Sequence, residues 1–182
     1  MKSRLLMLFF IGSEAFFFIA LIISYLVYSR SGGGLSASAR YLDITKSGIF
    51  SIMLFASSGT IIMAELRMKR GRRKASRWWL LATIILGFIF LAGQGIEYYR
   101  LYSENVTISR NVFGSAFFTL TGFHGLHVLT GLIVLSSIVY MIFSGKFIRL
   151  ESTALSSASI YWHFVDGVWV VVFSVVYLGS LL

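Results

Sequence analysis

Six ionisable side chains lie within long apolar stretches of the sequence, where a charge is expensive to bury. They are two glutamates, three histidines and one aspartate: Glu14, Glu97, His124, His127, His163 and Asp166. On membrane-insertion scales such a residue costs roughly 2.5–3.5 kcal/mol, so it normally faces protein and has a polar partner. These six residues are therefore the candidate functional residues of the chain.

Three kinds of chemistry are compatible with these residue types. His124 and His127 could bind a metal together with Glu97, but an i,i+3 histidine pair is a weak metal signal and the chain contains no Cys. Buried carboxylate–imidazole pairs can instead relay protons, as they do in pumps and transporters. The commonest use is structural, because a buried polar pair fixes the register of neighbouring helices. The structural use is therefore favoured over a proton relay, and a relay over a metal site.

Depth in the membrane predicts partners for three of the six residues. At about 1.5 Å per residue, Glu14 lies at the same level as His163 and Asp166, in the inner half of the membrane. We predict that the Glu14 carboxyl group hydrogen bonds to His163 or, next, to Asp166.

The other three residues form a second predicted layer nearer the outer surface. Glu97 lies near the outer end of its stretch, and His124 and His127 lie in the outer half of theirs. The two histidines also share a helix face, since they are three residues apart. We therefore place Glu97 with these histidines.

The elements that must position all six residues are five apolar stretches, at about 5–28, 48–66, 78–99, 112–143 and 158–182. A helix needs about 20 apolar residues to cross the hydrocarbon core, and no stretch here is long enough for two crossings. The sequence therefore predicts an all-α fold: one membrane domain over residues 1–182, made of five transmembrane helices.

Composition supports the membrane class and excludes others. The chain is 57% hydrophobic and 13% charged, whereas a soluble domain is about a quarter charged. Its net charge of +9 does not indicate nucleic-acid binding, because the basic residues lie between the apolar stretches. No nucleic-acid partner is expected.

The basic residues also predict the orientation of the chain. With the N-terminus inside, 11 of the 16 lie on the inner side and 5 on the outer side. The positive-inside rule therefore favours an inside N-terminus and an outside C-terminus. The inner residues are Lys2, Arg4, Arg67, Lys69, Arg70, Arg72, Arg73, Lys74, Arg77, Lys146 and Arg149; the outer ones are Arg30, Arg40, Lys46, Arg100 and Arg110.

The segment 67–77 concentrates seven of the inner basic residues. Each Lys or Arg near an anionic leaflet contributes about 1 kcal/mol of attraction, so this segment is a candidate site for lipid headgroups. Fixing the topology is the commoner explanation, and the two are compatible. Glu65 lies close enough in sequence to reach this segment. The headgroup candidates are Arg67, Lys69, Arg70, Arg72, Arg73, Lys74 and Arg77.

Five motifs resemble, in order along the chain, those of subunit III of haem-copper terminal oxidases. They are GSEAFFF at 12–18, GQGIEYYR at 93–100, FGSAFF at 113–118, GFHGLHV at 122–128 and YWHFVD at 161–166. Each motif alone is weak, but five in the right order are specific. Glu14 matches the membrane glutamate of the family and Glu97 the glutamate before its tyrosine pair. The three histidines and Asp166 match motif residues of the last two helices.

The resemblance implies a non-catalytic subunit of a respiratory complex in the bacterial plasma membrane. Such a subunit stabilises catalytic subunit I, supports its proton uptake and holds phospholipids against it. Subunit I is the main expected partner, with subunit II and other respiratory subunits next. Haem and copper are expected in those partner subunits. In this chain, no catalytic, cofactor-binding or metal-binding residue is expected. Many members have seven helices, so this sequence is similar to a five-helix form without the first two.

Several alternatives remain at this stage. The motifs GFHGLHV, YWHFVD and EYYR favour the cytochrome c branch of the family, but a ubiquinol oxidase subunit III and a homologue associated with nitric oxide reductase are alternatives. From another class, a stand-alone proton or ion transporter would also use buried carboxylates and histidines.

Overall fold

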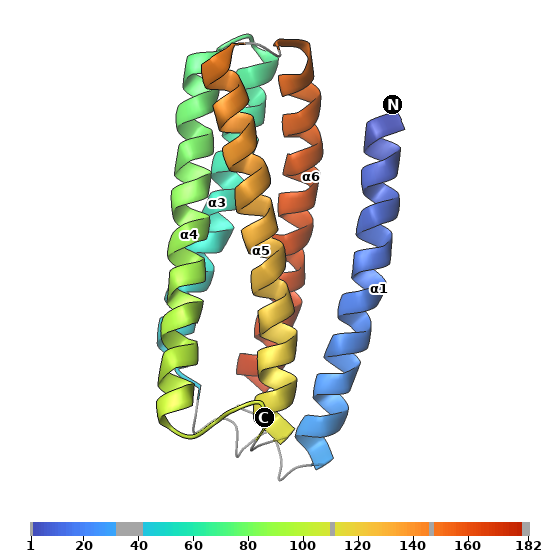
Figure 1. Ribbon diagram of the computed structural model, residues 1–182, viewed down its shortest axis with the longest axis vertical. Coiled ribbons are helices and arrows are strands. Elements are labelled where there is room, and N and C mark those ends of the chain that lie inside the picture. Colours follow the sequence, from blue (N-terminus) through green and yellow to red (C-terminus); the bar gives the residue numbers. More distant parts are fainter. Residues whose placement is uncertain (1, 32–41, 110–111, 146–147, 180–182) are drawn as a thin grey trace.

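The computed structural model describes residues 2–31, 42–109, 112–145 and 148–179, and within these ranges the structure contains helices and no strand (Figure 1). Five of the described helices are long and apolar enough to cross a membrane, which confirms the predicted all-α, five-span fold. The helices are α1 (Lys2–Ser31), α3 (Ile44–Lys69), α4 (Arg73–Ser103), α5 (Val112–Ser144) and α6 (Ile148–Phe173), continued by the π-helical turn η1 (Ser174–Leu178).

The helices are longer than the apolar stretches that predicted them, because polar residues continue a helix beyond the hydrocarbon core. The largest difference is in α6, which begins at Ile148, whereas the sequence predicted a start near residue 158. Ser156 lies before the predicted start of this span, but it is buried in the bundle. The Ser156 hydroxyl donates to Glu65 on α3 at 3.0 Å, so its polarity is satisfied inside the bundle.

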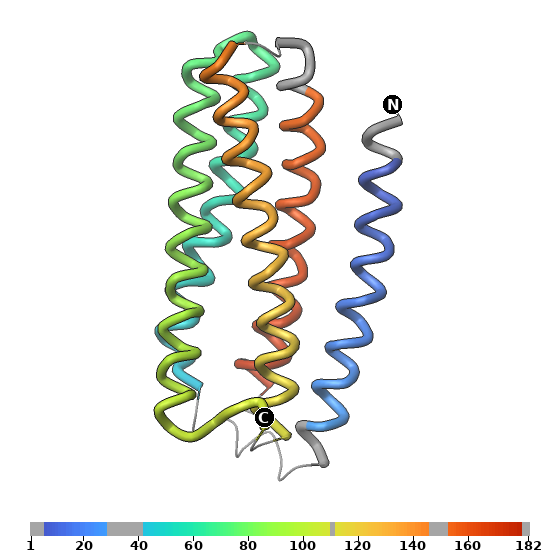
Figure 2. Tube along the Cα trace, in the orientation of Figure 1, coloured from blue at the N-terminus to red at the C-terminus, as the bar shows by residue number. Residues whose placement is uncertain are grey.

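Consecutive helices run antiparallel, and α3, α4, α5 and α6 form a bundle with α1 at its edge (Figure 1). α1 packs against α5 and α6, and α3 packs against α4 and α6. Toward its N-terminus α1 leans away from the other helices, as the Cα trace also shows (Figure 2). The tight turn between α3 and α4 places Gly71 at φ +72°, a conformation that favours glycine.

The centre of the bundle is closely packed around Trp162 on α6, which is fully buried. A Cβ atom built on Gly131 of α5 or Gly87 of α4 would lie 2.8 or 2.9 Å from its ring. Small residues on facing helices are what permits such an approach in a membrane bundle. The ring nitrogen of Trp162 donates to the Ser57 hydroxyl on α3 at 2.8 Å.

α1 is the helix that the rest of the chain covers least. Only 6% of its most apolar window is buried, compared with 28–44% for the other four spans. Large apolar side chains such as Leu6, Phe9 and Phe16 are exposed along it. In a membrane, these side chains must be covered by lipid or by another subunit.

Candidate functional site

Glu14 on α1 pairs with His127 on α5. Oε2 of Glu14 lies 3.0 Å from Nε2 of His127, and Nδ1 of the same ring lies 2.7 Å from the carbonyl oxygen of Phe123. A carbonyl oxygen only accepts, so Nδ1 carries a proton and donates to Phe123. One further proton is then shared between the Glu14 carboxyl group and Nε2. The Tyr161 hydroxyl on α6 donates to the His127 carbonyl at 2.9 Å, which links three helices at this point.

The predicted pairing of Glu14 with His163 or Asp166 is wrong. Depth does not decide between the candidates: Glu14 is about 17 residues from Ser31, His127 about 15 from Val112 and His163 about 15 from Leu178, all counted from the end of the bundle where α1 lies closest to the other helices (Figure 1). The helix face decides, because His163 and Asp166 turn toward α3 while His127 turns toward α1.

His163 and Asp166 of α6 instead meet Ser58 on α3. The Ser58 hydroxyl donates to Oδ2 of Asp166 and lies 2.9 Å from Nδ1 of His163. Because the single hydroxyl proton is used toward Asp166, Ser58 accepts from a protonated Nδ1. Asp166 is buried, and its Oδ1 has no hydrogen-bond partner among the described residues. Ser58 was not singled out from the sequence. The available signal was a short polar run within an apolar stretch, made of Ser57, Ser58 and Thr60.

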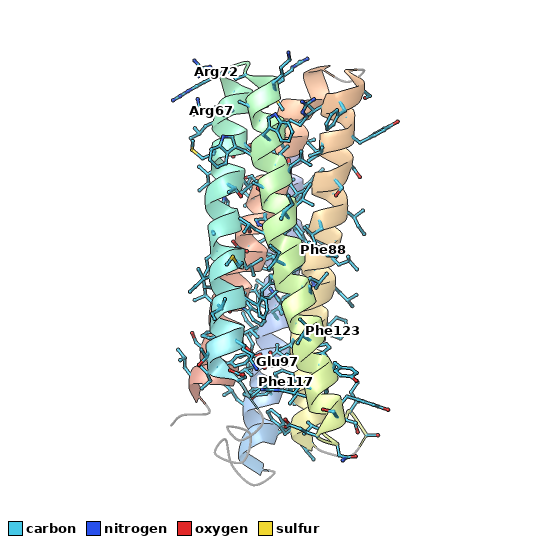
Figure 3. The ribbon with its side chains drawn as sticks, turned by 90° about the vertical axis from the view of Figure 1, so that its left-hand side faces the viewer. Arg67, Arg72, Phe88, Glu97, Phe117 and Phe123 are labelled. Carbon is cyan, nitrogen blue, oxygen red and sulfur yellow. The ribbon has the colours of Figure 1, made fainter. Side chains whose placement is uncertain are left out.

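Glu97 on α4 is hydrogen bonded to α3 and to the turn η1 that follows α6, and it lies toward the end of the bundle opposite Arg67 and Arg72 (Figure 3). Its Oε2 accepts from the Ser47 hydroxyl at 2.9 Å and from the Tyr177 hydroxyl at 2.6 Å. Its Oε1 lies 3.9 Å from the Arg100 guanidinium. Neither Ser47 nor Tyr177 was singled out from the sequence, because a serine near a helix start and a tyrosine near the membrane edge are both common.

The predicted grouping of Glu97 with His124 and His127 is therefore also wrong. On α4 the face that carries Glu97 and Gly93 packs on α3, where Gly93 lies against the ring of Phe50. The neighbouring face turns to α5, because the side-chain amide of Gln94 donates to the Thr121 carbonyl at 2.8 Å. A helix turns by about 100° per residue, so one position decides which neighbour a side chain meets.

His124 is fully buried and is packed as an aromatic ring. It stacks on Trp169 with ring centroids 4.7 Å apart, and Phe90 and Phe18 approach edge-on at 5.9 and 6.4 Å. Neither ring nitrogen has a hydrogen-bond partner among the described residues. Within the described ranges, no three His, Asp or Glu side chains are grouped as metal ligands.

Asp43, just before α3, caps the N-terminal end of that helix. Its side chain accepts from the backbone N–H of Lys46 at 3.1 Å, and its carboxylate lies 3.1 Å from the Lys46 ammonium and 3.5 Å from the Arg100 guanidinium. The hydrogen bond from the Lys46 backbone, followed by the Lys46 side chain, holds the pKa of Asp43 below its ordinary value of 3.8.

The basic segment 67–77 forms the opposite end of the bundle, where Figure 3 shows Arg67 and Arg72. Glu65 lies 2.8 Å from Lys69, which confirms that it reaches this segment. The Arg77 guanidinium lies over two rings, 4.1 Å from the centroid of Phe143 on α5 and 5.6 Å from that of Trp78. Lys2, Arg4, Arg30, Arg40, Arg110, Lys146 and Arg149, which entered the orientation argument, have side chains outside the described part of the chain.

The family model and the curated relatives that match this chain point to the same family. The model of the family "Cytochrome c oxidase subunit III" matches residues 2–181. A probable cytochrome c oxidase subunit 3 of Mycobacterium leprae is 36% identical over 167 residues, which are 92% of this chain and 83% of the relative. Cytochrome c oxidase subunit 3 of Corynebacterium diphtheriae is 36% identical with the same coverage. Cytochrome bo(3) ubiquinol oxidase subunit 3 of Pseudomonas putida is 33% identical, over 95% of this chain and 84% of the relative.

Proposed function

Because this chain belongs to the cytochrome c oxidase subunit III family and is a multi-pass subunit III of a bacterial haem-copper oxidase, we propose that it is a non-catalytic subunit that stabilises catalytic subunit I and supports its proton uptake. Family membership itself implies a multi-subunit respiratory complex. Subunit I is the proposed main partner, and subunit II the next. The haem and copper of the complex are proposed to reside in those subunits.

One observation carries the proposal: the acidic groups inside the bundle are each held by a neighbouring helix. Glu14 is joined to α5 by His127, Asp166 to α3 by Ser58, and Glu97 to α3 by Ser47. Each hydrogen bond fixes the relative position of two helices. This use of polar groups supports a structural role, in which the subunit presents a rigid surface to its partner.

Support of proton uptake is proposed to involve the Glu14–His127 pair. The pair shares one proton between α1 and α5, and its two side chains are 23% and 16% exposed on the sparsely covered α1 side. A partner subunit on that side would lie beside a group that can exchange a proton. The N-terminus is proposed to face the cytoplasm, which places the basic segment 67–77 against the anionic inner leaflet.

Cytochrome c is the proposed electron donor of the complex, because the relatives from M. leprae and C. diphtheriae are named cytochrome c oxidase subunits. A ubiquinol oxidase is the second candidate, favoured by the relative from P. putida.

The proposed role is tested with oxidase purified from cells that lack this chain. We expect the haem and copper absorption to persist, while proton uptake during turnover slows and the enzyme loses activity faster. Adding the chain back should restore both. Equal uptake and equal lifetime without the chain would refute a supporting role, and loss of the haem bands on its removal would refute a non-catalytic one.

A further inference from the structure

A groove follows the α4–α5 interface from the basic end of the bundle to mid-depth. Its volume is about 580 Å³, and it is lined by side chains of both helices. On α4 these include Ile84 and Phe88, and Figure 3 shows Phe88 on the face where α4 and α5 lie in front and α1 lies behind. The groove is therefore on the opposite side of α5 from the Glu14–His127 pair.

The groove is apolar although two serines line it. The Ser137 hydroxyl donates to the carbonyl of Ile133 in its own helix at 2.8 Å, so it presents little polarity to an occupant. Ile133 and Phe88 are 60% and 64% exposed, which is expensive in water and favourable against a hydrocarbon chain.

Arg77 lies at the inner end of the same stripe. Positions 77, 84 and 88 are spaced i, i+7 and i+11, so they share one face of α4. Arg77 is held over the Phe143 ring at 4.1 Å, and its Nε is buried without a hydrogen-bond partner. Among the described residues no carboxylate forms an ion pair with it. The guanidinium is thus fixed in place and lacks an anion.

The length of the stripe matches one leaflet of a bilayer. Arg77 and Phe88 are eleven positions apart, about 16 Å along a helix. Half of a hydrocarbon core of about 30 Å is close to that distance. Leu129 lines both this groove and a second, smaller hollow of about 220 Å³ in the other half of the interface, so the two hollows adjoin at mid-depth. A single acyl chain with its headgroup at Arg77 would fill the first groove alone.

We propose that Arg77 and the α4–α5 groove form a binding site for one anionic phospholipid of the inner leaflet, with the phosphate on the guanidinium and one acyl chain in the groove. The guanidinium is suited to this because its planar donors bind a phosphate in two places. The site rests on the proposed orientation of the subunit. It is more specific than attraction to the basic segment as a whole, since it selects Arg77 from seven basic residues.

The test counts lipids retained by the intact oxidase. Complexes carrying the wild-type chain or a variant are extracted from vesicles of equal phosphatidylglycerol and phosphatidylcholine, and retained lipids are counted by native mass spectrometry. Arg77→Gln removes the anion-binding group, and Ser137→Phe fills the groove while leaving Arg77 in place. Arg72→Gln is the matched control, because Arg72 is exposed at the same end of the bundle and lies over no ring.

We expect Arg77→Gln and Ser137→Phe each to lose one phosphatidylglycerol per complex, and Arg72→Gln to retain the wild-type number. The ratio of this chain to haem serves as the check that each complex is assembled. An unchanged count in either test variant, or an equal loss in Arg72→Gln, would overturn the site. If Arg77→Gln releases the chain from the complex without changing its lipid count, a partner carboxylate covers Arg77 and the site is refuted. A chain recovered without haem-bearing subunits would refute the proposed function instead, and its own lipid count would still test the site.

Discussion

At the scale of single residues, the account depends on which hydrogen bonds hold the buried carboxyl groups. The Glu14–His127 pair is the clearest, because the Phe123 carbonyl fixes the tautomer of the ring. With Nδ1 protonated, Nε2 can accept from a protonated carboxyl group or donate to a carboxylate. A side-chain amide at position 14 could also donate to it.

We therefore predict that Glu14→Gln is milder than Glu14→Leu. Gln keeps a donor for Nε2 of His127, whereas Leu leaves the nitrogen unsatisfied, at about 1–3 kcal/mol. Assembly with subunit I, measured by co-purification, should be near normal for Gln and reduced for Leu. Turnover should follow assembly. If Gln assembles normally but turnover falls, Glu14 relays protons and is more than a link between helices.

A second residue-scale prediction concerns Ser58, which satisfies His163 and Asp166 together. Ser58→Ala removes both interactions and should lower the free energy of unfolding by about 1–3 kcal/mol, measured by detergent denaturation of the purified chain. Ser137→Ala is the control, since Ser137 bonds only within its own helix and is exposed. Equal effects of the two substitutions would show that the Ser58 contacts do not stabilise the bundle.

At the scale of helices, the sequence predicted the number and the approximate position of the spans but not their partners. Length and hydropathy decide that α5 crosses the membrane. They do not decide whether Glu14 of α1 faces α5 or α6. The answer depends on which face each helix turns toward its neighbours, and this arises from packing between side chains far apart in the sequence. Of the six candidate residues, His124 and Asp166 are buried and the other four are partly buried, and both predicted groupings failed.

Close packing gives a prediction for α5. Gly131→Ala should destabilise the bundle, because its Cβ atom would lie 2.8 Å from the fully buried ring of Trp162. Overpacking of this kind typically costs about 1–3 kcal/mol. Gly95→Ala is the matched control, since nothing lies within 4 Å of its Cβ position. The thermal stability of the complex should fall for the first variant and be unchanged or higher for the second; the reverse order would contradict the packing at Trp162.

The N-terminal cap of α3 gives a prediction for stability and for its dependence on pH. Asp43→Ala should lower stability by about 0.5–2 kcal/mol, while Asp43→Asn keeps the cap and loses less. Because the pKa of Asp43 is lowered in the folded chain, its stabilisation is present above the ordinary pKa of 3.8 and is lost as the pH falls through the folded value. The difference in melting temperature between the wild type and Asp43→Ala should therefore shrink in acid. A constant difference from pH 6 to pH 3 would contradict the proposed contribution of its charge.

At the scale of the whole molecule, orientation in the membrane is the first prediction to test. The natural chain has no Cys, so single cysteines can be labelled without background. Cysteine introduced at Ala75, in the first turns of α4, should be protected from an impermeant reagent added outside intact cells. Cysteine introduced at Ser36, which lies outside the described residues, should react. The opposite pattern would invert the topology and move the basic segment away from the anionic leaflet.

The central claim is that this chain is a non-catalytic subunit of a haem-copper oxidase, and the distribution of haem and copper tests it most directly. A tagged chain would be purified from native membranes, and metal content and absorption spectrum measured before and after dissociation of the large subunit. We predict haem and copper in stoichiometric amounts with the intact complex and neither on the separated chain. Haem or copper that stays with the separated chain would contradict the claim, as would a chain that purifies alone and moves protons in liposomes.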